Sequence, residues 1–142
     1  LVKAKLTNSY NSEYCSLYYN LLYREINNIS IEKNVIFKKE TNIPDTKIKD
    51  VSSIEHNNKY IIINSNFYLT TSSTQTKYAD NITAIRSSIQ GMNNIKMVNI
   101  LDGAGWIGRS ADYIKVYNDC DYFLTLKTIS ELKDIIDDFL IK

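Results

Sequence analysis

The sequence is poor in histidine and in long apolar runs, and each scarcity excludes a class of protein. The only histidine, His56, stands in the polar run Glu55-His56-Asn57-Asn58, which is typical of an exposed turn. A catalytic triad or a histidine nucleophile is therefore not expected. No apolar stretch approaches the ~20 residues that a helix needs to cross a bilayer, so we expect no membrane partner.

Cysteine is scarce too, and the charges nearly cancel. Cys15 and Cys120 are far apart and lack the spacing of metal ligands, so we expect two free thiols, as in a cytoplasmic protein. The formal net charge of +1 excludes a strongly basic nucleic-acid-binding protein but permits a local basic surface. The length of 142 residues predicts a single domain over 1–142. Because the chain begins at Leu1, we also expect that it lacks sequence upstream.

Glycine is rare but concentrated. Three of the four glycines, Gly103, Gly105 and Gly108, fall within six residues. They follow the apolar run 95–101 and precede a helical period and a second apolar run, 122–126. This order predicts a strand, a glycine turn, a helix and a strand, the unit that builds a parallel or mixed sheet.

The remaining segments complete an α/β pattern. Apolar residues recur at helical spacing in three places, with a capping box at Thr128 to Glu131 before the last; the predicted helices are 9–26, 77–92 and 132–140. The tyrosines of the first helix are expected in the core. Segments 47–54 and 60–69 predict a hairpin that places Asp50 and Asn64 at neighbouring strand ends. The predicted fold is α/β, a mixed central sheet flanked by helices.

The glycine turn supports two hypotheses. Its Gly-x-Gly-x-x-Gly spacing matches the dinucleotide-binding fingerprint, but that site needs a carboxylate at the end of the next strand. That strand ends at Leu126-Lys127-Thr128, and Trp106 would obstruct a pyrophosphate. The favoured hypothesis is a structural elbow with Trp106 in the core.

The elbow belongs to a longer series of motifs. Asn64-x-Asn66-Phe67-Tyr68 is followed by a Ser/Thr loop, a helix with Arg86, the segment Asp102-Gly103-Ala104-Gly105-Trp106 and the strand Tyr122 to Lys127. This order resembles the C-terminal core of type II restriction endonucleases of the PD-(D/E)XK class, and is most similar to the DpnII-like group. The resemblance covers about Lys47 to Lys127. It implies a restriction-endonuclease-like fold, double-stranded DNA as partner, Mg²⁺ as cofactor and metal-dependent phosphodiester hydrolysis. Cutting both strands of a symmetric site would demand a homodimer or a partner subunit.

The resemblance also assigns a catalytic set. It places the first metal-binding carboxylate at Asp50, in preference to Asp45, and the second at Asn64; Asn66 matches the family. The loop lysine of the family falls near Thr74, with Lys77 as the candidate replacement. Asn64 and Thr74 depart from the pattern, because an amide ligates a metal without adding negative charge. The implied hydrolase is therefore active, degenerate, or completed by a neighbouring carboxylate such as Glu55.

Five positions are candidates for contacts with DNA phosphates. Ser72 and Ser73 lie in the uncharged loop 70–76, where hydroxyls and backbone amides suit phosphate oxygens. Lys77 and Arg86 lie on the following helix, and Arg109 follows the glycine turn. Two other hypotheses remain open. One is a non-catalytic interaction module that uses the tyrosine-rich first helix; the other takes Asp50 and Asn64 as ordinary polar residues at strand ends.

Overall fold

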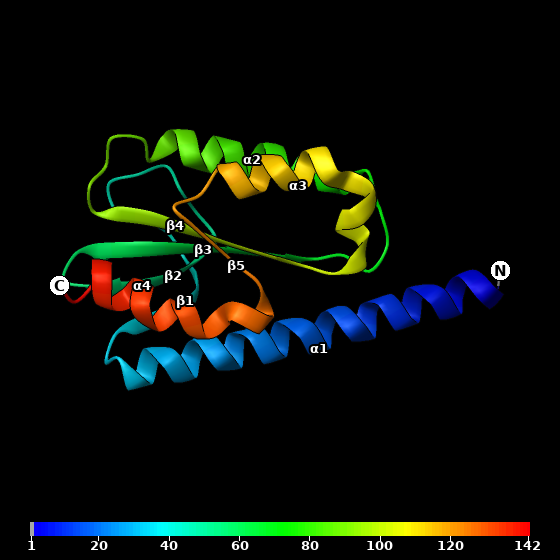
Figure 1. The fold of residues 1–142 in the computed structure, drawn as a ribbon, viewed down its shortest axis with the longest axis horizontal. Coiled ribbons are helices and arrows are strands. Elements are labelled where there is room, and N and C mark those ends of the chain that lie inside the picture. The colour runs from blue at the N-terminus through cyan, green and yellow to red at the C-terminus, as the bar shows by residue number, and fades with distance from the viewer. Residues whose placement is uncertain (1) are drawn as a thin grey trace.

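The computed structural model describes residues 2–142, with side chains from residue 13 onward. A five-stranded sheet forms its centre, with helices on both faces (Figure 1). The helices are α1 (Val2–Glu32), α2 (Thr74–Ser88), α3 (Ser110–Asn118) and α4 (Leu132–Phe139). The strands are β1 (Ile36–Thr41), β2 (Val51–His56), β3 (Lys59–Phe67), β4 (Ile95–Asp102) and β5 (Tyr122–Leu124). The predicted α/β class is confirmed.

The sheet is mixed, as predicted. Its order is β1-β2-β3-β4-β5, with the first three strands antiparallel and the last three parallel. Helix α2 connects β3 to β4, and α3 connects β4 to β5. The β2–β3 register ends at the pair Ser52 and Ile63, so the last four residues of β3 extend beyond β2. There the Phe67 N–H donates to the Tyr19 hydroxyl at 3.1 Å, which replaces a bond from a neighbouring strand.

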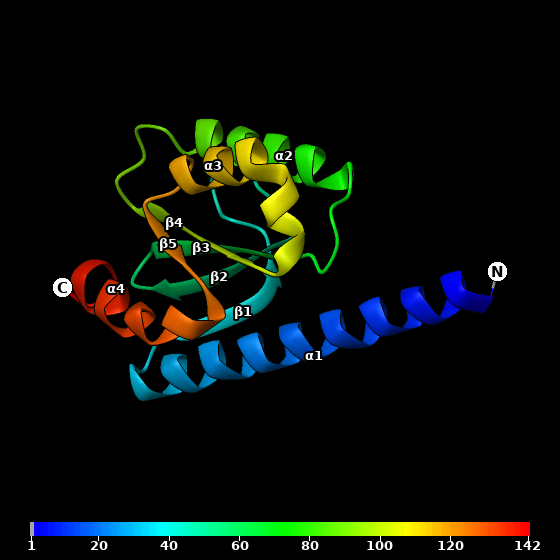
Figure 2. The same cartoon turned by 45° about the vertical axis from the view of Figure 1, so that its right-hand side comes forward.

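One face of the sheet is covered by α1 and α4 and is almost wholly apolar (Figures 1 and 2). The side chains of Leu22 and Ile26 on α1 and of Leu132 and Ile136 on α4 are fully buried. Tyr18 stacks on Phe67 with ring centroids 4.6 Å apart, which confirms the core position expected for this tyrosine.

The rest of the tyrosine-bearing stripe on α1 is divided. Tyr14 is 51% exposed and Leu17 is 54% exposed, whereas Tyr19 and Tyr23 pack against the apolar core. Tyr10 lies outside the side chains that the structure describes. Because most of the described tyrosines of α1 point inward, the helix does not offer a continuous aromatic contact surface. Within the described part of the chain, no helix combines the length and apolarity that membrane spanning requires.

The other face is covered by α2 and α3, which meet through polar side chains. Residues spaced by three or four along α2 each contact a partner near α3; the pairs are Thr76–Asp112, Asp80–Lys115, Thr83–Asp119 and Arg86–Asp121. We call this series the α2–α3 polar ladder. The layer between the ladder and the sheet is apolar, with Ile62, Ala79 and Met97 fully buried.

The glycine turn is an elbow that packs against the protein's own backbone. A Cβ atom at Gly103, whose φ is 100°, would lie 2.1 Å from the Tyr68 carbonyl oxygen, and one at Gly105 would lie 2.5 Å from that of Thr70. The Gly105 N–H donates to the Tyr68 carbonyl at 2.8 Å. Trp106 is 4% exposed, as expected for a core residue. The close approach that these glycines permit is therefore to the loop after β3, which favours the structural hypothesis.

Two local predictions were wrong. The capping box is formed by Thr125 and Thr128, at the start of a 3₁₀ helix, Leu126–Glu131, that precedes α4. Thr128 therefore caps the 3₁₀ helix rather than α4. The predicted strand 47–54 begins only at Val51, because Asp50 has a φ of 57° and donates its N–H to the Asn42 side chain at 3.1 Å.

Candidate functional site

A cavity of about 440 Å³ opens where β3 extends beyond β2. It is bounded by the loop before β2, by β3 and by α2, and Tyr23 of α1 reaches it as well. Its polar and charged lining residues include Lys47, Lys49, Asp50, Asn64, Ser65 and Asn81. Asp50 and Asn64, which sequence analysis placed at neighbouring strand ends, line this one cavity. We call it the Asn64 pocket.

Asp50 is the single carboxylate among the described residues that line the Asn64 pocket. It is exposed, and its left-handed backbone is one that aspartate tolerates better than most residues. Asp45 also has a positive φ, of 62°, but it does not line the pocket. Glu55, the neighbouring carboxylate considered as a substitute, forms an ion pair with Lys38 at 2.9 Å and also lies outside the pocket lining.

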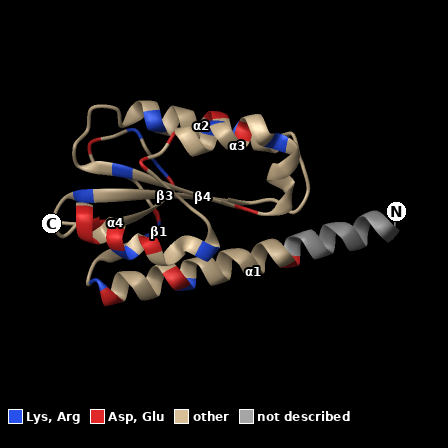
Figure 3. Ribbon diagram, viewed as in Figure 1, with Lys and Arg blue, Asp and Glu red and all other residues tan. Residues whose placement is uncertain are grey.

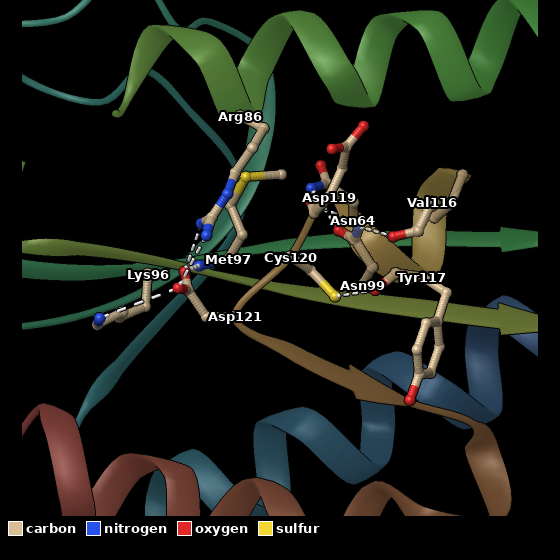
Figure 4. Close-up of polar contacts among 10 residues, drawn as sticks. All are labelled: Asn64, Arg86, Lys96, Met97, Asn99, Val116, Tyr117, Asp119, Cys120 and Asp121. Carbon is tan, nitrogen blue, oxygen red and sulfur yellow. Dashed lines mark hydrogen bonds and ion pairs between the residues drawn. The ribbon is translucent and has the colours of Figure 1, made fainter. Parts of the chain in front are cut away.

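Asn64 is 8% exposed and begins a chain of hydrogen-bonded amides that runs from β3 to the neighbouring strand β4 and then to α3. Its Nδ2 donates to Oδ1 of Asn99, the neighbouring residue on β4, at 3.0 Å. The Asn99 Nδ2 in turn donates to the carbonyls of Val116, at 2.9 Å, and Asp119, at 3.3 Å (Figure 4). These bonds fix the Asn64 side chain and leave its oxygen as the atom that can accept a further bond or ligate an ion.

This donor set does not fit a magnesium ion. Mg²⁺ is usually held by one or two carboxylates together with waters and phosphate oxygens in octahedral geometry. The pocket offers one carboxylate, Asp50, and two neutral amides, Asn64 and Asn81, beside two lysines. Across the described residues, no group of three or more His, Cys, Asp or Glu side chains is placed to hold a metal.

The other three candidates for catalysis lie outside the pocket lining. Oδ1 of Asn66 is buried and has no partner among the described residues. Thr74 begins α2, and its hydroxyl bonds to that of Tyr68, at 2.6 Å, and to that of Ser72, at 2.9 Å. Lys77 is exposed one turn further along α2.

The candidate phosphate contacts fall at two separate places. Ser72 and Ser73 lie in the loop after β3, and Arg109 ends a 3₁₀ helix, Ala104–Arg109, that follows β4. The two segments are tied together by the bond from the Thr71 hydroxyl to the Gly105 carbonyl at 3.1 Å. Ser72 donates its N–H to Gln75 Oε1 at 2.8 Å. The Arg109 Nε is buried and unpartnered among the described groups.

Arg86 is different, because both arms of its guanidinium bond to Asp121, at 2.8 and 3.2 Å (Figure 4). Burial alone would raise the pKa of Asp121, but the hydrogen bonds from Arg86 and from the Met97 N–H outweigh it and lower the pKa. Arg86 is thus the last residue of the α2–α3 polar ladder. Both of its terminal nitrogens donate to Asp121, so these donors are already engaged within the protein.

Sequence reasoning missed the residues that shape the pocket from other segments. Asn99 looked like one polar residue in a strand, and only the parallel register brings it beside Asn64. Tyr78 falls within the helical period that predicts the helix 77–92, yet it lines the pocket, and burial raises its pKa. Lys47 and Lys49 had a visible signal, since the pattern Lys-x-Lys-Asp directly precedes β2.

The structure is an α/β fold with a mixed sheet, an antiparallel β2–β3 hairpin and a polar pocket at the hairpin's open end, and the family match below implies that the fold is restriction-endonuclease-like. The chain belongs to the DpnII restriction endonuclease family, whose sequence pattern matches residues 4–136. That family consists of type II restriction endonucleases, hydrolases of DNA that typically depend on Mg²⁺. Neither curated proteins nor solved structures gave a match to this chain.

Proposed function

We propose that this chain binds double-stranded DNA as a member of the DpnII family and has lost the family's phosphodiester hydrolysis. Family membership supports DNA as the substrate class. The proposed loss of hydrolysis rests on Asn64. The resemblance requires a carboxylate at this position, but Asn64 has a neutral amide, which donates a hydrogen bond to Asn99.

The physical reason is electrostatic. Hydrolysis of a phosphodiester needs a cation to activate water and to neutralise the charge that develops on phosphorus oxygens. A pocket with one carboxylate and two lysines repels such a cation more than it attracts it. The second departure, Thr74, removes the amine that would assist the water, and Thr74 instead bonds to Tyr68 and Ser72.

DNA binding itself does not need the lost groups. Ser72, Ser73 and Lys77 at the start of α2 and Arg109 after the elbow remain as proposed phosphate contacts. Lys and Arg residues are distributed over both helix layers rather than gathered on one face of the described chain (Figure 3). We therefore expect moderate affinity with a steep dependence on salt.

The test combines binding and cutting on the same samples. Supercoiled plasmid is incubated with protein and Mg²⁺ or Mn²⁺, and binding of a duplex is followed by fluorescence anisotropy. The expected result is a bound duplex and an uncut plasmid. Nicking by the unaltered protein would overturn the proposed loss, whereas absence of DNA binding at all salt concentrations would overturn the proposed function.

A reversion sharpens this test. The double variant Asn64→Glu with Thr74→Lys introduces the glutamate and the lysine of the family pattern at these two positions. We expect metal-dependent nicking to appear in this protein. The control carries Asp50→Asn in addition, which removes the remaining carboxylate and should abolish the gained activity. Calorimetric titration with Mg²⁺ should show tighter binding to the Asn64→Glu protein than to the unaltered one.

A further inference from the structure

The charge balance of the Asn64 pocket is the reverse of what a cation site needs. Lys47 and Lys49 line it together with the single carboxylate Asp50. Neither lysine forms an ion pair with another described residue, whereas Lys33, Lys38 and Lys115 do. Two ammonium groups that form no ion pair with described residues, beside one carboxylate, give this concave surface a net positive charge. A surface of this kind attracts anions.

The neutral side chains of the pocket suit an anion as well. Ser65 stands on the part of β3 that extends beyond β2, and Asn81 faces the cavity from α2. A hydroxyl and an amide donate hydrogen bonds to phosphate oxygens as readily as they ligate a cation. A glutamate at position 64, together with Asp50, would have balanced the two lysines, so the presence of Asn64 leaves the pocket with a net positive charge.

We propose that the Asn64 pocket takes a phosphate group of the DNA backbone directly on Lys47 and Lys49, with no metal ion between them. This inference rests on the proposed DNA binding and adds to it the place and the chemistry of the contact. In this arrangement Asp50 weakens binding, since its carboxylate repels the phosphate. In a metal-dependent site the same carboxylate would strengthen it.

That opposite sign makes Asp50→Asn the most informative variant. Binding of a fluorescent duplex is measured by anisotropy in EDTA, so that no divalent cation takes part. We expect the Asp50→Asn protein to bind about two- to fivefold more tightly than the unaltered protein, the size of effect typical of one exposed charge. The reverse order, with Asp50→Asn binding more weakly, would overturn the inference.

The lysines are tested by a matched pair of double variants. Lys47→Ala with Lys49→Ala should lower affinity at least tenfold at low salt and reduce the slope of log K against log salt by about 1–2, as expected for two lost phosphate contacts. The control, Lys133→Ala with Lys142→Ala, removes the same charge from α4 and the residues after it, across the sheet from the pocket.

The two proposals fail in different ways. Equal affinity for the pocket and control variants would overturn the phosphate site while leaving DNA binding in place. No binding of duplex by the unaltered protein would overturn the proposed function itself. Lys47, Lys49 and Lys142 are exposed, and Lys133 is half-buried in an ion pair with Glu32 at 3.1 Å. Because such a surface ion pair contributes at most about 1 kcal/mol, thermal melting curves should change little in both double variants, which separates lost contacts from lost folding.

Discussion

The two faces of the sheet differ in what holds them together. Helices α1 and α4 cover one face with fully buried leucine and isoleucine, whereas α2 and α3 cover the other through a polar ladder and a chain of buried amides. Buried apolar surface stabilises a fold wherever it lies, but buried polar groups need specific partners. The α2–α3 face therefore combines stability with most of the polar lining of the Asn64 pocket, whereas the α1–α4 face supplies mainly stability and reaches the pocket only through Tyr23 among the described residues.

The largest effect should come from the apolar face. Leu22→Ala removes a fully buried side chain from α1, and we expect a loss of about 3 kcal/mol in the free energy of unfolding. Leu17→Ala on the same helix, at a position that is 54% exposed, is the control and should have little effect. Urea unfolding measures both. Equal losses would show that α1 does not pack as described. DNA affinity of the folded fraction should stay unchanged.

On the polar face, the amide chain gives the next largest effect. Asn99→Leu leaves the Val116 carbonyl and the Asn64 amide without their partner, and we expect a loss of roughly 1–3 kcal/mol in the free energy of unfolding. Asn94→Ala, which removes an exposed amide bonded to the Asn58 carbonyl, is the matched control. Unlike Leu22→Ala, this variant should also alter DNA affinity, because Asn64 loses its fixed orientation.

A third test uses pH to probe buried tyrosines on the two faces. Burial raises the pKa of Tyr18 on α1 and of Tyr78 on α2. Their neutral forms are thus favoured in the folded state, so their contribution is fully present below about pH 10, the usual tyrosine value, and is lost as the pH rises. Stability should fall by about 1.4 kcal/mol per pH unit and per suppressed ionisation above that value.

The matching variants identify the groups responsible. Tyr18→Phe and Tyr78→Phe should each flatten the alkaline fall, whereas Tyr117→Phe, at an exposed site, should not. Thermal melting between pH 8 and pH 11 provides the measurement. An alkaline fall of the same steepness in all three variants would contradict the burial of these hydroxyls.

The smallest effect is expected in the middle of the α2–α3 polar ladder. Lys115 pairs with Asp80 at the surface, where screening by solvent removes most of the attraction. Lys115→Ala should leave the melting temperature unchanged. A drop as large as that of Asn99→Leu would mean that the ladder, rather than the amide chain, holds α3 to the sheet.

Elements with strong periodicity were predictable from the sequence. The apolar runs 95–101 and 122–126 became the parallel strands β4 and β5, and the glycine elbow between them followed from residues that must approach another backbone closely. The pocket was only partly predictable. Asp50 and Asn64 were placed together by the hairpin, but Asn99 joins them through β4, 35 residues beyond Asn64, and single-strand patterns carry no information on register.

The loop before β2 was the least predictable part. Its alternation resembled a strand, but the left-handed backbone of Asp50 and the bond from its N–H to Asn42 make the strand begin at Val51. The same loop presents Lys47 and Lys49 to the pocket. Side chains of a loop take their direction from tertiary contacts, and these contacts were not visible in the local pattern.

The most direct test of the account is the affinity of the unaltered protein for duplex DNA in EDTA compared with Mg²⁺, with the DNA recovered afterwards and examined for cuts. The account predicts similar binding in both buffers and intact DNA in each. Binding that appears only with Mg²⁺, or strands cut in its presence, would contradict it.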